Sequence, residues 1–130
     1  MAAIEDRIAT LDEGALDTFE FGITRLDSTG TVRFFNKAEA RFTSRRAEDT
    51  IGLNFFREVA PCAAVRNFQG RFDEFVTAPE LTSETFGFIY PFWLGHKQVK
   101  ITMVRRPSEP DSVYLVTEFT STAAGASVAS

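Results

Sequence analysis

The chain contains one cysteine, Cys62, and one histidine, His96, so it has few groups suited to nucleophilic chemistry. A thiol becomes a strong nucleophile when a base takes its proton, but His96 follows Gly95 in a predicted hairpin turn rather than near Cys62. No set of residues has the pattern of a catalytic triad or the ligand spacing of a metal site. The residues therefore argue against an enzyme, and Cys62 taken alone is typical of an inert core thiol.

Three other residues are spaced so that they could line a pocket. Phe35, Glu39 and Thr43 stand at positions i, i+4 and i+8, which places them toward one side of a strand–helix junction. A carboxyl and a hydroxyl beside a large ring would suit a ligand site. However, Glu39 is also the third residue after Asn36, where a capping box favours glutamate. From spacing alone, capping is the preferred interpretation of Glu39.

The elements around these residues are short helices and strands. Residues 1–20 predict a small helical N-terminal cap, because Ile4, Ile8, Leu11 and Leu16 recur at helical intervals. The remaining predictions follow from turn residues, capping signals and apolar periodicity. They are a hairpin over 21–35 with its turn at 27–30, a helix from Asn36 to about Thr43, a short helix capped by Ser44 and ending by Thr50, a loop fixed by Pro61, an amphipathic helix over 67–78, and strands at Ser83–Phe92, Lys97–Arg105 and Ser112–Phe119 joined by Gly95-His96 and by 107–110.

This order of elements predicts an α+β fold that is PAS-like, with a five-stranded antiparallel sheet flanked by short helices and a helical N-terminal cap. We expect one domain over residues 1–119. The small polar residues of 120–130 predict a disordered tail. Pro91 inside a predicted strand indicates an edge position or a bulge.

The composition argues against several classes of function. The 130 residues carry a formal net charge of -4, which argues against nucleic acid as a partner because phosphate binding needs clustered cations. No apolar stretch approaches the about 18 residues of a membrane span, and the N-terminus lacks the pattern of a signal peptide. We therefore expect a cytoplasmic protein without a membrane partner. The 14 phenylalanines predict an aromatic core that would suit a planar ligand.

The segment LDSTGTVRFFNKAEARFTSRRAEDTIGLNFFREVAPC strongly resembles the photoactive yellow protein family, the xanthopsins. The resemblance extends from about Ile4 to Phe119, nearly the whole chain. A generic PAS domain can share the asparagine and the Ile-Gly pair, but not the Ala-Pro-Cys ending. The most specific matches are Asn36, Ala38, Glu39, Thr43 and Arg45 at family spacing, Ile51-Gly52-x-Asn54-Phe55-Phe56, and Val59-Ala60-Pro61-Cys62.

The resemblance implies a chromophore, p-coumaric acid (4-hydroxycinnamic acid), bound covalently as a thioester on Cys62. It implies that Glu39 is protonated and donates a hydrogen bond to the buried phenolate, that Thr43 belongs to the same network, and that Arg45 shields the pocket. Phe35 stands where the family usually has a tyrosine as second donor. The remaining wall positions implied by the resemblance are Phe55, Val59, Ala60, Tyr90, Phe92 and Leu94.

The implied function is blue-light reception: trans–cis isomerisation, proton transfer from Glu39, and partial unfolding of the cap over residues 1–20. The partners would be the chromophore and a downstream signalling protein whose identity the sequence leaves open, with the chain a monomer or weak dimer. The main alternative is a PAS-type sensor or interaction module that binds another small ligand or none, with Cys62 structural and Glu39 only a cap. A thiol enzyme ranks third.

Overall fold

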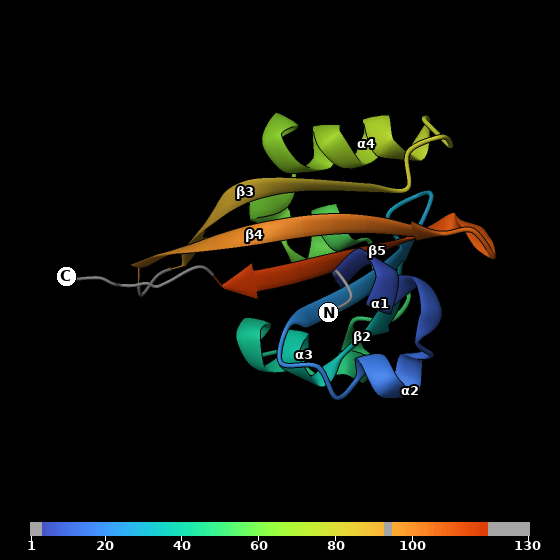
Figure 1. Ribbon diagram of the computed structural model, residues 1–130. Helices are drawn as coiled ribbons and strands as arrows, with labels where there is room; N and C mark the ends of the chain where they lie inside the picture. The colour runs from blue at the N-terminus through green and yellow to red at the C-terminus, as the bar shows by residue number, and fades with distance from the viewer. Residues whose placement is uncertain (1–3, 93–94, 120–130) are drawn as a thin grey trace.

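The computed structural model describes residues 4–92 and 95–119. Within these residues, five strands form one antiparallel sheet in the order β2-β1-β5-β4-β3. Helix α4 lies beside the edge strand β3, and α3 lies near β1 and β2 at the other end of the sheet (Figure 1). The predicted α+β, PAS-like fold class is confirmed. The strands are β1 (Gly22–Asp27), β2 (Val32–Phe35), β3 (Ser83–Phe92), β4 (Gly95–Arg106) and β5 (Glu109–Phe119).

The β1–β2 hairpin forms because Asp27 organises its turn. One carboxylate oxygen of Asp27 accepts hydrogen bonds from the amides of Thr29 and Thr31, each at 3.0 Å. Gly30 follows with a φ of 87°, a left-handed conformation that glycine adopts without a steric penalty. This turn sets the register in which Thr24 pairs with Phe35, just before α3 begins.

The helices are short, as predicted. The N-terminal pair, α1 and α2, precedes the sheet, and α3 begins directly after the hairpin with Asn36 as its N-cap. A series of helical turns then connects α3 to β3. The helices are α1 (Ile4–Thr10), α2 (Glu13–Leu16), α3 (Lys37–Thr43), a 3-10 helix (Ala47–Asp49), a π-helical turn (Phe55–Val59), a second 3-10 helix (Pro61–Ala63), a second π-helical turn (Arg66–Gly70) and α4 (Arg71–Val76).

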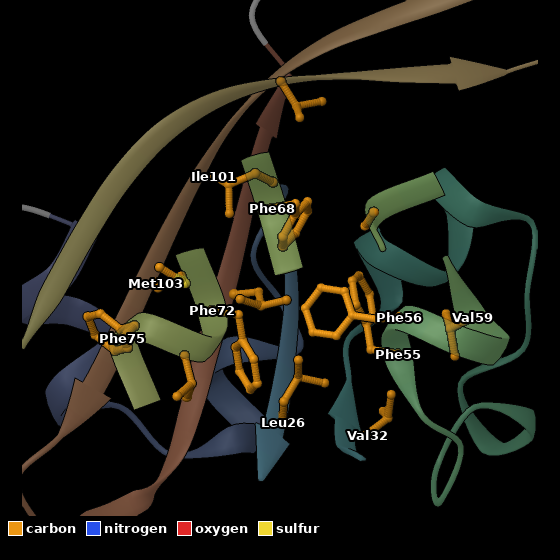
Figure 2. Close-up of a cluster of buried hydrophobic side chains, with 14 of the residues drawn as sticks. Leu26, Val32, Phe55, Phe56, Val59, Phe68, Phe72, Phe75, Ile101 and Met103 are labelled. Atoms are coloured by element: carbon orange, nitrogen blue, oxygen red, sulfur yellow. The ribbon is translucent and has the colours of Figure 1, made fainter. Parts of the chain in front are cut away.

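Each face of the sheet carries a buried apolar cluster, because successive side chains of a strand point to opposite faces. Ile101 and Met103 of β4 contribute to the larger cluster. Figure 2 shows them near the phenylalanines of the helical turns and of α4. Val104 and Tyr114 belong to the other cluster, which is completed by α1 and α2. The phenylalanines of the larger cluster in this region are Phe55, Phe56, Phe68, Phe72 and Phe75.

Three local predictions were wrong. Ser44 does not cap a second helix: it ends α3 with a φ of 58°, and its amide donates to the carbonyl of Ala40. The residues after it form only one 3-10 turn, without a side-chain cap. Gly95 and His96 are not a turn but the start of β4, where they continue the β3–β4 register by pairing with Phe92 and Pro91. The amphipathic segment after Pro61 begins as a π-helical turn rather than as α-helix.

Other predictions agree or fall outside the described residues. Pro91 lies in β3, an edge strand, where its missing amide costs no sheet hydrogen bond to a further strand. The predicted disordered tail, residues 120–130, and the first three residues of the cap lie outside the described residues. Among the helices that the structure does describe, none has the length and apolar character that crossing a bilayer requires.

Candidate functional site

A cavity of about 190 Å³ brings together most of the residues expected at the site. It lies where α3, the helical turns over 55–63 and β3 meet. Glu39, Thr43, Arg45, Val59, Ala60, Cys62 and Tyr90 all line it, although they come from three separate parts of the chain.

The other expected residues do not line this cavity or cannot be placed there. Phe35 and Phe55 are 3% and 1% exposed and pack in the larger core cluster. Phe35 ends β2, as predicted, but it does not join Glu39 and Thr43 in the cavity wall. Phe92 belongs to β3, but its side chain is not described, and Leu94 lies outside the described residues.

Glu39 is an almost fully buried carboxyl whose side chain does not cap the helix. The backbone amide of Glu39 donates to Oδ1 of Asn36 at 2.9 Å, so Asn36 caps α3 as predicted. A capping box would also need the carboxyl of Glu39 to accept from the amide of Asn36, but that amide donates to the carbonyl of Ile23. Within the described residues, Oε1 of Glu39 is buried without a hydrogen-bond partner. The preferred interpretation from spacing, a capping role for the carboxyl, was therefore wrong.

Burial determines the charge of this carboxyl. Glu39 is 2% exposed, and desolvation raises its pKa to about 7. Its side chain packs against the backbone of β1 at Gly22, where an added Cβ atom would collide with Oε1 of Glu39. Sequence reasoning missed Gly22. Gly22 is the first residue of β1, and a glycine in a strand can mark the close approach of another group, which here is the carboxyl.

Cys62 lies in the 3-10 turn over Pro61–Ala63 and is exposed, so its interpretation as a core residue was wrong. Although the residue as a whole is exposed, partial desolvation of the thiol raises its pKa, and a backbone hydrogen bond only partly offsets this. The thiol is thus protonated at neutral pH. It would need an activated partner to form a covalent bond.

Tyr90 contributes a buried phenol to the same cavity. It is 4% exposed, and its ring meets that of Phe42 edge-to-face, with the ring centres 5.4 Å apart. Desolvation, together with the nearby charges of Glu39 and Cys62, raises the pKa of Tyr90 well above its ordinary value. Tyr90 therefore keeps its proton and can act as a hydrogen-bond donor. Phe42, also in the wall, was missed; its place between Glu39 and Thr43 on α3 was the available signal.

Thr43 and Arg45 are held at the wall by contacts to the backbone. The hydroxyl of Thr43 donates to the carbonyl of Glu39 at 2.9 Å, one turn earlier in α3. Nη2 of Arg45 donates to the carbonyl of Glu58 at 3.3 Å, which ties the end of α3 to the π-helical turn. The cavity thus suits a small, mainly apolar molecule that reaches from an exposed thiol to a buried carboxyl with a raised pKa.

No metal site competes with this interpretation in the described part of the chain, where no three histidine, cysteine or carboxylate side chains gather as metal ligands would. Comparison with known proteins is more specific. Photoactive yellow protein of Rhodothalassium salexigens is 36% identical over 102 residues, which cover 78% of this chain and 81% of that protein. This chain belongs to the photoactive yellow protein family.

Other members of the photoactive yellow protein family agree. That of Halochromatium salexigens is 36% identical over 100 residues, covering 77% of this chain and 79% of the relative. Among solved structures, the photoactive yellow protein domain of the sensor histidine kinase Ppr from Rhodospirillum centenum matches with a TM-score of 0.77 and 31% identity, covering 88% of this chain and 99% of that domain. No protein-family model matches the chain.

More distant structures support the fold alone. The PAS domain of the RpfR quorum-sensing receptor from Cronobacter turicensis, solved in complex with BDSF, aligns with a TM-score of 0.64 at 15% identity, over 79% of this chain and 96% of that domain. Together, the photoactive yellow protein relatives and the PAS neighbours identify the chain as a PAS-type photoreceptor or sensor.

Proposed function

We propose that this protein is a blue-light photoreceptor that carries p-coumaric acid as a thioester on Cys62. One observation carries the proposal: the only cysteine of the chain shares a small cavity with a buried carboxyl whose Oε1 has no hydrogen-bond partner in the described residues. A buried polar atom without a partner is costly unless a ligand satisfies it. A hydroxycinnamoyl group fits this donor set, since it has an acyl end for the thiol and a phenol end for the acid.

Each residue of the cavity would have its own role toward the bound chromophore. Glu39, whose pKa burial raises to about 7, donates a hydrogen bond to the phenolate end from its protonated form. Thr43 and Tyr90 contribute hydroxyl groups to the same cavity wall. Arg45 would shield the cavity from solvent. When bound, the coumaroyl group supplies absorption of blue light and isomerisation of its double bond from trans to cis.

Glu39 would then give up the proton of its carboxyl to the phenolate end of this group and become a buried carboxylate, a state that costs several kcal/mol. Asn36 connects this residue to the cap, because its Oδ1 accepts from the amide of Glu39 while its Nδ2 donates to the carbonyl of Leu16, 3.0 Å away. We propose that the cap over residues 1–20 opens in part, admits water to the carboxylate and forms the signal. Such local opening is typical of short segments with few buried contacts.

The decisive experiment uses p-coumaric anhydride and the purified full chain. The sulfur of Cys62 attacks one acyl carbon, a C–S bond forms, coumarate leaves, and the thiol proton passes to solvent. We expect a mass increase of one coumaroyl group on Cys62 and a new absorption band in the blue. Mildly alkaline buffer favours the reaction, because the pKa of this thiol is raised.

Cys62→Ala is the control and should acquire neither the mass nor the band. An adduct of equal yield in Cys62→Ala, or a Cys62 that stays fully alkylatable after incubation, would contradict the proposal. The second outcome would favour the alternative, a PAS-type sensor that binds a different small ligand or none.

Phe35 leads to a prediction about the colour of the loaded protein. Phe35 occupies the position where the resemblance implies a second tyrosine donor, but it has no hydroxyl and packs in the core outside the cavity wall. The phenolate would therefore lack one donor, at a cost of about 1.5–3 kcal/mol or roughly 1–2 pKa units. Near neutral pH we expect a fraction of protonated chromophore with a blue-shifted band. Phe35→Tyr should lower the apparent pKa in a titration followed by absorption.

Phe34→Tyr is the matched control, because Phe34 is the neighbouring residue of β2 and packs against the opposite cluster. It should leave the titration unchanged. A single ionic band down to strongly acid pH, unmoved by Phe35→Tyr, would show that another residue already supplies the second donor and that the prediction is wrong.

A further inference from the structure

A second hollow, of about 570 Å³, lies beside the cavity and shares Arg45 with it. It is bounded by the end of β2, by α3 and by the 3-10 helix over Ala47–Asp49. We call it the basic groove, because Lys37, Arg41, Arg45 and Arg46 line it. Its apolar lining comes from Phe34, Phe35, Ala40 and Ala47.

The carboxylates around the basic groove neutralise only part of its charge. Asp17 pairs with Lys37 at 3.8 Å. Arg46 pairs with Asp49 at 3.0 Å and with Glu48, which also lines the groove, at 3.5 Å. In the part of the chain that the structure describes, Arg41 has no ion pair, and the guanidinium of Arg45 reaches only a backbone carbonyl. The groove therefore concentrates unpaired positive charge in a chain whose formal net charge is -4.

The arrangement of these cations indicates the chemistry of the occupant. Lys37 and Arg41 are one turn apart on α3, about 6 Å along its axis, and Arg45 follows after the helix has ended at Ser44, so all three cations line the groove. The half-buried ring of Phe34 lies at the apolar lining of the same groove. A set of cations next to apolar surface matches a segment with carboxylates on one side and an apolar side chain on the other.

Polyanions fit less well. Nucleic acid and anionic membranes present extended negative charge, which the net negative charge of the whole chain repels. A short segment would meet only the local positive field.

We propose that the basic groove docks an acidic, amphipathic segment of a partner protein. This inference goes beyond the proposed photochemistry and does not depend on a bound chromophore. Because Arg45 belongs to both walls, the docked segment would lie directly next to the cavity that contains Glu39 and Cys62.

Selection of a displayed library of random short peptides on the full chain tests the proposal. We expect enrichment of peptides that combine Asp or Glu with aromatic or aliphatic residues. In fluorescence anisotropy, the best enriched peptide should lose at least about tenfold in affinity to Arg41→Glu, equivalent to about 1.4 kcal/mol, and should bind more weakly as salt rises.

Arg66→Glu is the matched control: Arg66 is also an exposed arginine, but it lies outside the groove. The affinity of Arg66→Glu for the peptide should equal that of the wild type. Backbone amide NMR shifts on peptide addition should cluster in residues 34–48.

Four results would overturn the proposal. The first is enrichment of neutral or basic peptides, or of no peptides at all. The second is a loss of peptide binding in Arg66→Glu equal to that in Arg41→Glu. The others are binding of phosphatidylserine vesicles instead of peptides, with the same dependence on Arg41, and self-association of the chain that Arg41→Glu abolishes.

Discussion

Replacing Glu39 with glutamine should raise the free energy of unfolding of the chromophore-free protein at about pH 8 by about 3 kcal/mol more than it does at about pH 4. The cause is the pKa of Glu39, which burial raises from 4.5 to about 7. Glu39 is 2% exposed, so solvent screens this effect little.

The direction follows from where the proton is bound. Below pH 4.5 the carboxyl is protonated in both states and contributes no pH dependence. Between 4.5 and about 7 the unfolded chain has released the proton while the folded chain keeps it, so each pH unit lowers the free energy of unfolding by about 1.4 kcal/mol. Above that range both states are ionised, and the loss is complete. Glutamine cannot ionise and escapes this loss.

Urea unfolding of Glu39→Gln and of the wild type across this pH range measures the effect. The contributions of the other carboxyl groups to the pH dependence cancel in the difference, because both proteins contain them. Glu74→Gln is the control, since Glu74 is exposed on α4 and makes no ion pair in the described residues. If the difference between Glu39→Gln and the wild type stays constant with pH, then Glu39 has an ordinary pKa. The neutral donor required by the proposed photochemistry would then be lost as well.

Asn36→Ala should be the most damaging single polar substitution, with an expected loss of about 3–5 kcal/mol in the free energy of unfolding. Asn36 is fully buried and satisfies four backbone groups. Its Oδ1 accepts from the amides of Ile23 and Glu39, and its Nδ2 donates to the carbonyls of Leu16 and Phe21, all at 2.9–3.0 Å. Alanine would leave these groups buried without partners, each at a cost of about 1–3 kcal/mol before relaxation.

The loss should also appear locally, because Leu16 belongs to α2 in the cap. Limited proteolysis is expected to cut Asn36→Ala within residues 1–20 faster than the wild type, under conditions where both remain folded by circular dichroism. Asn67→Ala is the control, because Asn67 is exposed and has no side-chain hydrogen bond in the described residues. A loss below about 1 kcal/mol, no more than a single helix cap is worth, would show that water or rearrangement replaces these bonds.

Helix α3 and its surroundings show which local features could be predicted from the sequence. The cap at Asn36, the helix to Thr43 and the turn between Asp27 and Gly30 were predictable, because each depends on residues within one or two turns of each other. The end of α3 was not. Ser44 is a good N-cap by type, yet the fold uses it in a left-handed conformation to end the helix.

The amino-acid sequence by itself determined the element order, the PAS-like fold class and, through the residues around Cys62, the family. It left Glu39 undecided between helix cap and buried acid. Only the tertiary structure settled its environment, because the carbonyl of Ile23 takes the amide that a capping box would need, and Gly22 lets the carboxyl pack against β1. Such partners are distant in the sequence, and their effect on burial and pKa arises only when the sheet and α3 come together.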